Sequence, residues 1–414
     1  MATGSSAATR RRAFLGIIAA LVLAIGAFTL FAPRDEATPP AAPARSVEGD
    51  GVGTAIAADA PTVQSPPAYL AWMSGGFPAD VRAKARTLDG LESTVVVAGD
   101  TRWMTRSLDA DGEVVDEPKA SFAIPIDAFA VNPVEYEPFL PEELRGDVTG
   151  ALNEGLGVLS TRSAAMRNIG VGGVMEFGGD HVRIGAIAPD EAIGWSELLV
   201  SRDVGTTLGV RDDRYLLALA EGTPSEERFA DTVGTLLPEG TALRVVKPGG
   251  SEFMRVASGV NPPIVLKEVF GEFAARPDAD DPAVLTIEPS WVSRHIDTRV
   301  VPILGRVTCN EAFFPALLKA LREVEREGLS SMLQTYNGCW NARTVARSPT
   351  APPSFHAYGA AIDINAASNA YGAVPTMDER VVAIFERDGF NWGGDFLVPD
   401  GMHFEYWQPM EAAA

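Results

Sequence analysis

The sequence is poor in basic residues. It contains 34 lysines and arginines against 55 aspartates and glutamates, which gives a formal net charge of −21. A chain with this balance has little with which to neutralise phosphates, so nucleic acid is not expected as a partner. The composition is otherwise globular, with 46% hydrophobic residues. The length of 414 residues predicts two folded domains plus a targeting segment.

Long hydrophobic runs are also scarce, apart from one near the N-terminus. Residues 13–32 are uncharged and follow the basic cluster Arg10, Arg11 and Arg12. Their length lies between a long signal sequence and a spanning helix, and the preceding charge sends the rest of the chain out of the cytoplasm. Residues 1–32 therefore predict a cytoplasmic basic stretch plus a signal or anchor helix. We expect an extracytoplasmic protein, anchored in the membrane through residues 13–32 or exported, and "RRRAFLG" resembles a twin-arginine export signal.

Cysteine is rare, with only Cys309 and Cys339 in the chain. Exported proteins with an even number of cysteines usually pair them, so we predict one disulfide. Such a bridge would close a loop of about thirty residues and contribute roughly 3 kcal/mol to stability. The alternative is two buried thiols that do not meet.

Histidine is rare as well, with four residues in the chain. His181, in "GGDHVRIG", is expected to be a surface turn residue. His295 has no motif partner and is expected to be structural. His356 and His403 both lie within about the last sixty residues, each near a carboxylate in a strand-like segment.

The pattern along the rest of the chain divides it into three parts. Residues 33–67 are rich in alanine and proline and predict a flexible linker. Residues 68–250 alternate short apolar runs with turn signals, which predicts a β-rich domain of unknown role with helices near 76–90 and 140–156. The C-terminal domain is expected over residues 251–414. The strands expected in the β-rich domain are 93–99, 120–126, 181–188, 196–202, 214–220 and 242–250.

Two amphipathic helices are predicted in the C-terminal domain. Residues 313–329 place apolar side chains at helical spacing and end near Gly328. Residues 376–390 begin with Thr376, followed by Glu379 as in a capping box. The strand-like segments are "SSMLQTY" (330–336), "AAIDIN" (360–365) and "MHFEYW" (402–407).

Two of these strands place side chains that can bind a metal on one face. In "AAIDIN" the alternation turns Asp363 away from the isoleucines on either side of it. In "MHFEYW" it places His403 and Glu405 on the same face. Each strand therefore combines a polar face with an apolar one.

His356 precedes the first of these strands. Gly359 permits a sharp turn that brings the imidazole over Asp363. With His403, two imidazoles and one carboxylate make three protein ligands, which leaves the fourth position of a catalytic zinc for water. Asp400, three positions before His403, is placed to act as a general base. By itself the pair His356 and Asp363 is more often structural, so this prediction depends on all these residues together.

Three segments together carry a family resemblance. "SFHAYGAAIDIN", "FNWGGDF" and "DGMHFEYW" resemble the Ser-x-His-x-x-Gly-x-Ala-x-Asp and Glu/Asp-x-x-His pattern of the VanY-like zinc D-alanyl-D-alanine carboxypeptidases. This family also includes D-Ala-D-Ala dipeptidases and phage L-alanyl-D-glutamate endopeptidases. The resemblance covers roughly residues 264–408 and says nothing about residues 1–250.

The resemblance implies a role for each site residue. Asp400 takes the position of the catalytic acid or base. Ser354 takes the position of a serine that helps to hold the substrate. Arg343, in "GCWNAR", is expected to hold the scissile carbonyl and to stabilise its oxyanion. The residues implied to bind Zn²⁺ are His356, Asp363 and His403.

The expected fold of the whole chain is α+β, with a small antiparallel sheet flanked by helices in the C-terminal domain. The pattern of residues 1–250 adds a separate β-rich domain and the N-terminal signal or transmembrane segment before it. The implied function is a zinc-dependent peptidoglycan peptidase, a D-alanyl-D-alanine carboxypeptidase that trims stem peptides through a metal-activated water. Asp400 is an aspartate rather than a glutamate, which resembles the endopeptidase branch, so an L-Ala-D-Glu endopeptidase is one alternative. A non-catalytic wall-binding protein is the other, and the presence of every ligand and of Asp400 argues against it.

Overall fold

The computed structural model describes most of the chain beyond the N-terminal segment, namely residues 65–73, 75–248, 261–348 and 351–407. The expectations for the signal or anchor helix and for most of the linker lie outside the described residues. Within these ranges, no helix is both long enough and apolar enough to cross a membrane. The predicted boundary near residue 250 falls between two described segments, so the division into domains stays a prediction.

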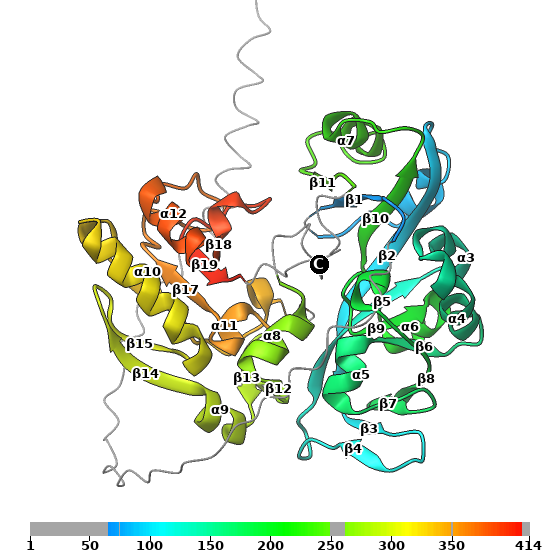
Figure 1. Cartoon of the computed structure of the whole chain (residues 1–414), viewed down its shortest axis with the longest axis horizontal. Helices are drawn as coiled ribbons and strands as arrows, with labels where there is room; N and C mark the ends of the chain where they lie inside the picture. The colour runs from blue at the N-terminus through cyan, green and yellow to red at the C-terminus, as the bar shows by residue number, and fades with distance from the viewer. Residues whose placement is uncertain (1–64, 74, 249–260, 349–350, 408–414) are drawn as a thin grey trace, which may run out of the picture. The chain divides into compact units, whose positions relative to one another are not determined.

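The first part of the described chain is built around one large mixed sheet (Figure 1). In order across the sheet, its strands are β11 (Arg244–Val246), β1 (Tyr69–Trp72), β10 (Asp213–Ala220), β2 (Leu91–Met104), β5 (Ile124–Val131), β9 (Leu198–Ser201), β6 (Gly157–Ser160), β8 (Asp180–Ala188), β7 (Val174–Phe177), β3 (Arg106–Leu108) and β4 (Val114–Asp116). β5 pairs with β9, and β6 with β8, in parallel, whereas the other neighbours are antiparallel. Each of the six expected strands overlaps one of these strands.

The centre of this sheet is buried on both faces. Phe129 of β5 and Leu199 of β9 belong to one hydrophobic cluster, whereas Ala128 and Leu198 belong to another. Successive side chains of a strand point to opposite faces, so each strand contributes to both clusters. This burial explains why the sequence of these strands is a nearly continuous apolar run.

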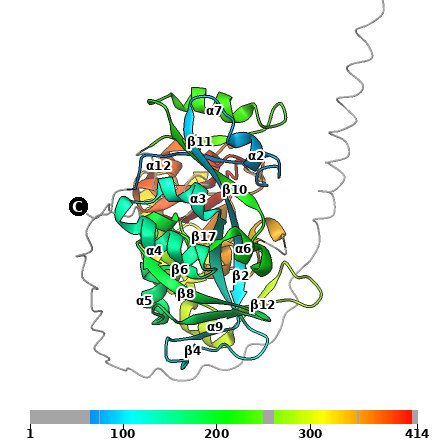
Figure 2. The same ribbon diagram turned by 90° about the vertical axis from the view of Figure 1, so that its right-hand side faces the viewer.

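Short helices accompany the sheet. They are α2 (Val81–Ala85), α3 (Pro133–Tyr136), α4 (Glu142–Asn153), α5 (Thr161–Arg167), α6 (Arg202–Leu208) and α7 (Glu226–Gly234), with 3-10 turns η1 (Glu137–Phe139) and η2 (Asp190–Ile193). The expected helix over 140–156 is α4, which packs on β6 and β8 (Figure 1). α7 lies beside β11 (Figure 2). The helix expected over 76–90 is only α2, because the backbone before it turns at Gly75 and Gly76, whose φ angles are 85° and 80°.

The second part contains a four-stranded antiparallel sheet, as expected. Across it, the strands are β16 (Tyr336–Gly338), β17 (Ala361–Ile364), β19 (His403–Tyr406) and β18 (Phe390–Trp392). Two further antiparallel pairs are β12 (Ala275–Pro277) with β13 (Leu285–Ile287), and β14 (Ile296–Val301) with β15 (Gly305–Asn310). The expected strands "AAIDIN" and "MHFEYW" are β17 and β19.

The helices of the second part are α8 (Pro263–Phe270), α9 (Pro289–His295), α10 (Phe314–Arg326), α11 (Phe355–Tyr358) and α12 (Glu379–Arg387), with 3-10 turns η4 (Glu311–Phe313), η5 (Ser330–Met332), η6 (Val345–Arg347) and η7 (Gly393–Asp395). α10 and α12 are the two predicted amphipathic helices. They pack against each other, and α12 also packs on β18 (Figure 1). Leu317, Leu321 and Val324 of α10 are fully buried, as their helical spacing predicts.

The predicted cap of α12 is wrong by two residues. Asp378 is the N-cap, and its carboxylate accepts a hydrogen bond from the backbone N–H of Arg380 at 2.9 Å. Thr376 instead donates its hydroxyl to the carbonyl of Ser368 at 3.0 Å. Aspartate and threonine both cap helices, so tertiary contacts decided which residue does so here.

The strand expected over 330–336 is also wrong over most of its length. Residues Ser330–Met332 form the turn η5, and β16 begins only at Tyr336. The backbone N–H groups of Gln334 and Thr335 donate to the side-chain oxygen of Asn365, at 2.8 and 3.0 Å. The side chain of Asn365, just after β17, thus takes the place of a strand partner.

The two other histidines, His181 and His295, do not belong to the group of side chains that could hold a metal ion among the described residues. His181 is exposed and lies in β8, next to the β7–β8 turn rather than within it. His295 ends α9, where its ring packs on that of Trp291 with centroids 5.0 Å apart. The structural reading of His295 therefore agrees with its contacts.

Four charged side chains connect the two parts of the described chain. Nζ of Lys267, on α8, lies 2.8 Å from Glu197 and 2.9 Å from Glu272. Arg167, on α5, pairs with the same two carboxylates. The side chains of Lys267, Arg167 and Glu197 are fully buried. Two cations therefore balance two anions in the interior of the compact unit Ala60–Ala414.

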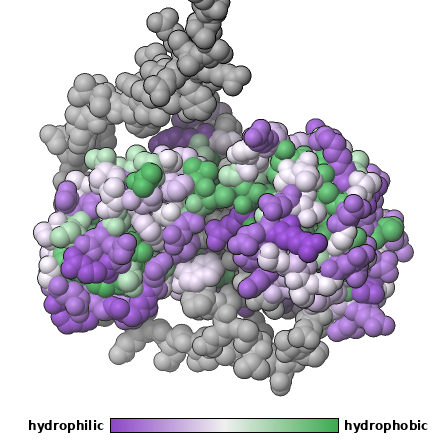
Figure 3. All heavy atoms as spheres, turned by 90° about the horizontal axis from the view of Figure 1, so that it is seen from above, coloured by the Kyte–Doolittle hydropathy of each residue, from purple (hydrophilic) through white to green (hydrophobic). Residues whose placement is uncertain are grey.

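Among the described residues, few large hydrophobic side chains are exposed. Figure 3 shows hydrophilic side chains over much of one face, with smaller hydrophobic groups among them. In the part of the chain that the structure describes, the large hydrophobic residues that are more than half exposed are Val134, Val171, Val300, Tyr371 and Val374. They are spread over several segments, and hydrophobic residues scattered in this way are ordinary on a protein surface.

Candidate metal centre

The small sheet brings Asp363 and His403 together. In the register of β17 with β19, Asp363 lies directly opposite His403, although the two residues are 40 positions apart in sequence. Nδ1 of His403 is 3.1 Å from Oδ1 of Asp363. Ile362 and Phe404, the neighbours on the opposite face, are fully buried. The predicted alternation therefore holds for both strands.

His356 reaches the same carboxylate from α11, the short helix before β17. Nε2 of His356 is 3.3 Å from Oδ1 of Asp363. The helix ends at Gly359, which has a φ of 67°, as the predicted sharp turn requires. A Cβ atom at Gly359 would lie 2.5 Å from the backbone nitrogen of Asn310, so only glycine fits this approach.

Both imidazoles are fixed from outside by acceptors that the sequence did not reveal. Nδ1 of His356 is 2.7 Å from the carbonyl oxygen of Cys339, and Nε2 of His403 is 3.2 Å from Oε2 of Glu405. If Nδ1 of His356 and Nε2 of His403 carry the ring hydrogens, the other ring nitrogen of each residue has a lone pair directed toward Asp363. Strand alternation had placed Glu405 beside His403 but did not assign it a partner.

The three inner atoms fit a metal ion. Ligand atoms of His356, Asp363 and His403 all lie within 4.8 Å of one another. A tetrahedral zinc with bonds of about 2.0–2.1 Å would separate its ligand atoms by about 3.3 Å, close to the 3.1 and 3.3 Å separations from Asp363. Two imidazoles and one carboxylate also form a donor set suited to zinc.

The charges and hydrogen bonds of these side chains act strongly on one another's pKa values. Burial acts to raise the pKa of Asp363, but hydrogen bonds from His356 and His403 outweigh it, and the pKa is lowered. Burial acts to lower the pKa of His403, but its contacts with Asp363 and Glu405 raise that pKa to about 10. A carboxylate that stays ionised between two imidazoles is a good ligand for a cation.

Asp400 lies near the three residues expected to be ligands. Burial raises the pKa of Asp400, and the charges of His403, Asp363, His356 and Arg343 also act on it. Among the described residues, Oδ1 of Asp400 is buried without a hydrogen-bond partner. A carboxylate with a raised pKa and a free oxygen can accept a proton from water.

The turn that carries Asp400 is held by hydrogen bonds from two sides. The backbone N–H of Asp400 donates to the carbonyl of Gly393 at 2.7 Å. The carbonyls of Pro399 and Asn369 accept from Gly372 and Met402, at 2.7 and 3.1 Å. The stretch "NAASNAYG" after β17 therefore supports the turn that bears the expected base.

Arg343 and Ser354 lie on adjacent segments near the site. The backbone N–H of Ser354 donates to the carbonyl of Arg343 at 2.9 Å. Burial lowers the pKa of Arg343, and the carboxylates of Asp363 and Asp400 act on it in the opposite direction. The hydroxyl of Ser354 accepts a hydrogen bond from the backbone N–H of His356 at 3.3 Å, so Ser354 is the N-cap of α11.

The predicted disulfide is present, joining Cys309 of β15 to Cys339 after β16. Both cysteines are buried. The bridge anchors the carbonyl of Cys339, which is the outer acceptor for His356. The neighbouring Trp340 donates its backbone N–H to the carbonyl of Thr308 at 2.9 Å, which ties the same segment to β15.

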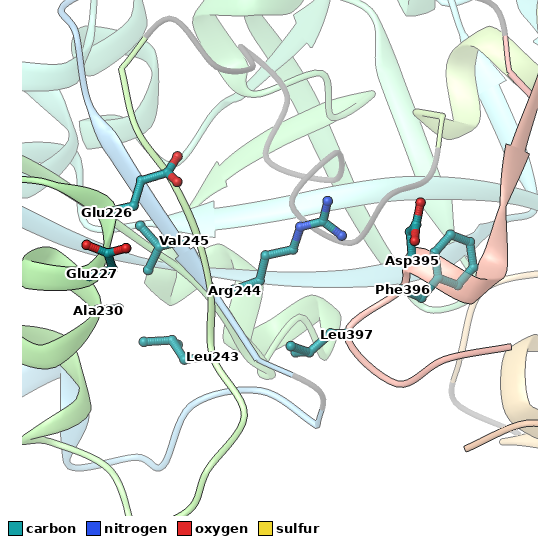
Figure 4. Close-up of a pocket in the computed structure, with 9 residues that line it drawn as sticks. All are labelled: Glu226, Glu227, Ala230, Leu243, Arg244, Val245, Asp395, Phe396 and Leu397. Carbon is teal, nitrogen blue, oxygen red and sulfur yellow. The ribbon is translucent and has the colours of Figure 1, made fainter. Parts of the chain in front are cut away.

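A cavity of about 500 Å³ lies near one edge of the site. Figure 4 shows Asp395, Phe396 and Leu397 on one side of it, facing residues of α7 and β11 that include Glu226 and Arg244. The ring of Phe396 lies 6.1 Å from that of His403, centroid to centroid. Phe396 therefore lines the cavity and also lies near His403.

Residues 347–406 match the sequence model of a protein family described as D-alanyl-D-alanine carboxypeptidase. The matched segment contains Ser354, His356, Asp363, Asp400 and His403. It supports a peptidase in the C-terminal part of the chain. No curated protein sequence matches the chain.

Some solved structures are similar to about 44% of the chain. One is the periplasmic region of MacB from Actinobacillus actinomycetemcomitans, at 10% identity, covering 88% of that chain, with a TM-score of 0.31. Another is the extracellular domain of the noncanonic ABC-type transporter YknZ from Gram-positive bacteria, at 18% identity, covering 100% of that chain, with a TM-score of 0.28. At these TM-scores the likeness carries no argument about this protein.

Proposed function

We propose that the C-terminal part of the chain is a zinc-dependent peptidase that cuts peptidoglycan stem peptides, as a D-alanyl-D-alanine carboxypeptidase. The observation that carries the proposal is the convergence of Nε2 of His356, Oδ1 of Asp363 and Nδ1 of His403 beside the carboxyl group of Asp400. The family match over residues 347–406 supports the substrate class. The donor set and its spacing support Zn²⁺ as the ion.

Zn²⁺, when bound, would polarise the scissile carbonyl and lower the pKa of a water molecule. Asp400 accepts a proton from the water molecule while the oxygen of that water attacks the carbonyl carbon. The same carboxyl group then gives that proton to the amine that leaves when the C–N bond breaks. Asp400 suits both steps because burial raises its pKa.

Arg343 and Ser354 position the substrate. One guanidinium nitrogen of Arg343 donates to the carbonyl of Thr344 at 3.2 Å, which leaves other N–H groups for the substrate carbonyl oxygen as it gains negative charge. The hydroxyl of Ser354 accepts from His356 and keeps its own hydrogen for the peptide. Ser354 thus combines a cap with a substrate contact.

The same residues would serve an L-Ala-D-Glu endopeptidase, which is the second candidate. The aspartate at position 400 favours it, because the resemblance places aspartate in the endopeptidase branch. The two activities differ in whether the site must accommodate a free terminal carboxylate. The buried disulfide between Cys309 and Cys339 supports action outside the cytoplasm, where such bridges persist.

The test is product analysis with the zinc-loaded protein. A muropeptide that ends in D-alanyl-D-alanine should lose one alanine, detected by mass. Release of new amino groups from the stem or from cross-linked wall would support the endopeptidase instead. No product from either substrate, together with equal zinc content in His356→Ala and the parent, would refute the proposed metallopeptidase.

Asp400→Asn separates the base from the ligands. This variant should keep its zinc and lose about 100-fold or more of kcat, since amide nitrogen and oxygen cannot take up the proton. Metal content by atomic emission and kcat on the muropeptide are the two measurements. Loss of zinc would show that Asp400 is a ligand rather than the base.

A further inference from the structure

Glu405 is a buried carboxylate to which the proposed mechanism gives no part. Its side chain is only 2% exposed. Oε2 of Glu405 lies 3.2 Å from Nε2 of His403, and Oε1 accepts a hydrogen bond from Nδ2 of Asn391 at 3.3 Å. Each carboxylate oxygen therefore has its own neighbour, one of which is an expected metal ligand.

The sheet holds Glu405 in this place from both sides. Ala361 of β17 and Asn391 of β18 lie opposite Glu405 in the strand register. Alanine leaves room for the carboxylate under the imidazole of His403, and the asparagine supplies a donor. Burial of a carboxylate is costly unless it is hydrogen-bonded, so the arrangement needs His403 as a second donor.

We propose that Glu405 is the positioning residue for His403, accepting the hydrogen on Nε2 so that Nδ1 is presented to the metal. This inference rests on the proposed function, since it concerns the same centre. The carbonyl of Cys339 has the same role for His356, since it accepts the hydrogen on Nδ1 of that ring. The two imidazoles therefore present different nitrogens, Nε2 of His356 and Nδ1 of His403, and an outer acceptor selects each one.

Zinc affinity, measured by competition with a chromophoric chelator, tests the role without relying on turnover. Glu405→Ala should bind zinc about 10- to 100-fold more weakly than the parent. Glu405→Gln should lose less, because its amide oxygen can still accept from Nε2. Asp388→Ala is the matched control: Asp388 is also a buried carboxylate, but it pairs with Lys319 at 3.0 Å and should leave zinc affinity unchanged.

The ring nitrogens of His403 provide a second measurement. In zinc-loaded protein with labelled histidine, the ring proton of His403 should be on Nε2 in the parent, as read from two-bond proton–nitrogen correlations. This readout and Glu405→Gln decide the question if Glu405→Ala does not fold. A ring proton on Nδ1 of His403 would overturn the inference.

The outcomes distinguish this inference from the proposed function. Equal zinc affinity in Glu405→Ala and the parent, with weaker binding in His356→Ala, would refute only the role of Glu405. An equal loss of affinity in Asp388→Ala would also refute it, because any buried carboxylate would then have the same effect. Equal affinity in His356→Ala and the parent would refute the metal centre itself.

Discussion

At the scale of single residues, Asp190 is a carboxyl group whose burial makes stability depend on pH. It lies in η2, only 6% exposed, with Nε of Arg162 3.9 Å away. Burial raises the pKa of Asp190 to about 6. The folded state therefore binds this proton more tightly than the unfolded chain. The stabilisation is complete below the ordinary pKa of an aspartate and is lost as pH rises through about 6.

Asp190→Asn should remove this part of the pH dependence. Between pH 4 and pH 8, the free energy of unfolding of the parent should fall by about 2 kcal/mol relative to that of the variant. Urea unfolding at both pH values gives the comparison. If the two proteins lose stability in parallel over this range, the carboxyl group of Asp190 is not the source.

At the scale of elements, the disulfide links β15 to the segment that orients His356. Removal of both sulfurs in Cys309→Ala with Cys339→Ala should lower the free energy of unfolding by roughly 3 to 4 kcal/mol, since the bridge spans 30 positions. Zinc affinity should fall as well, because the carbonyl of Cys339 is then held less firmly. Calorimetry with and without zinc measures both effects.

A parent treated with a reducing agent is the natural comparison for the double variant. It should show the same loss of zinc affinity while both side chains remain in place. Unchanged zinc affinity in the double variant and in the reduced parent would mean that the hydrogen bonds of Trp340 and Asn341 to Thr308 and His356 hold the segment without the bridge.

The helices and strands differ in how far the sequence predicts them. α10 and α12 follow from apolar spacing, because a helix needs only near neighbours in sequence. The strand expected over 330–336 fails because Asn365, about thirty residues later, binds the backbone there. The helix predicted over 76–90 begins later, as α2, for a local reason: two glycines turn the chain before it.

At the scale of the whole molecule, the buried network of Arg167, Glu197, Lys267 and Glu272 connects the two parts of the chain. Glu197→Ala should lower the free energy of unfolding by about 3–5 kcal/mol, because it leaves two buried cations with a single carboxylate. Chemical denaturation measures this loss. Glu197→Gln, which keeps the hydrogen-bond acceptor, should lose less and serves if the alanine variant does not fold.

The control for the network is an ion pair on the surface. Asp297 and Arg299 pair at 2.7 Å, but their side chains are 48% and 42% exposed. Asp297→Asn should therefore change stability little. Equal effects of Glu197→Ala and Asp297→Asn would mean that the buried network does not stabilise the fold.

The residues of the candidate centre, and the strand faces on which they lie, are predictable from local features of the sequence. Strand alternation and a glycine turn, which are local properties of the backbone, made His356, Asp363 and His403 candidates, and the family resemblance implied them as ligands. The even cysteine count likewise predicted the disulfide that the structure contains.

Tertiary structure alone decided which nitrogen each imidazole presents. The acceptor for His356 is a carbonyl 17 positions away, and any residue type could have supplied it. The contact between His403 and Asp363 spans 40 positions. Glu405 is two positions from His403 on the same face of β19, and the neighbouring strands place Ala361 and Asn391 opposite it. Backbone acceptors leave no mark in a sequence, since every residue has a carbonyl group, and only the packed chain shows which one is near.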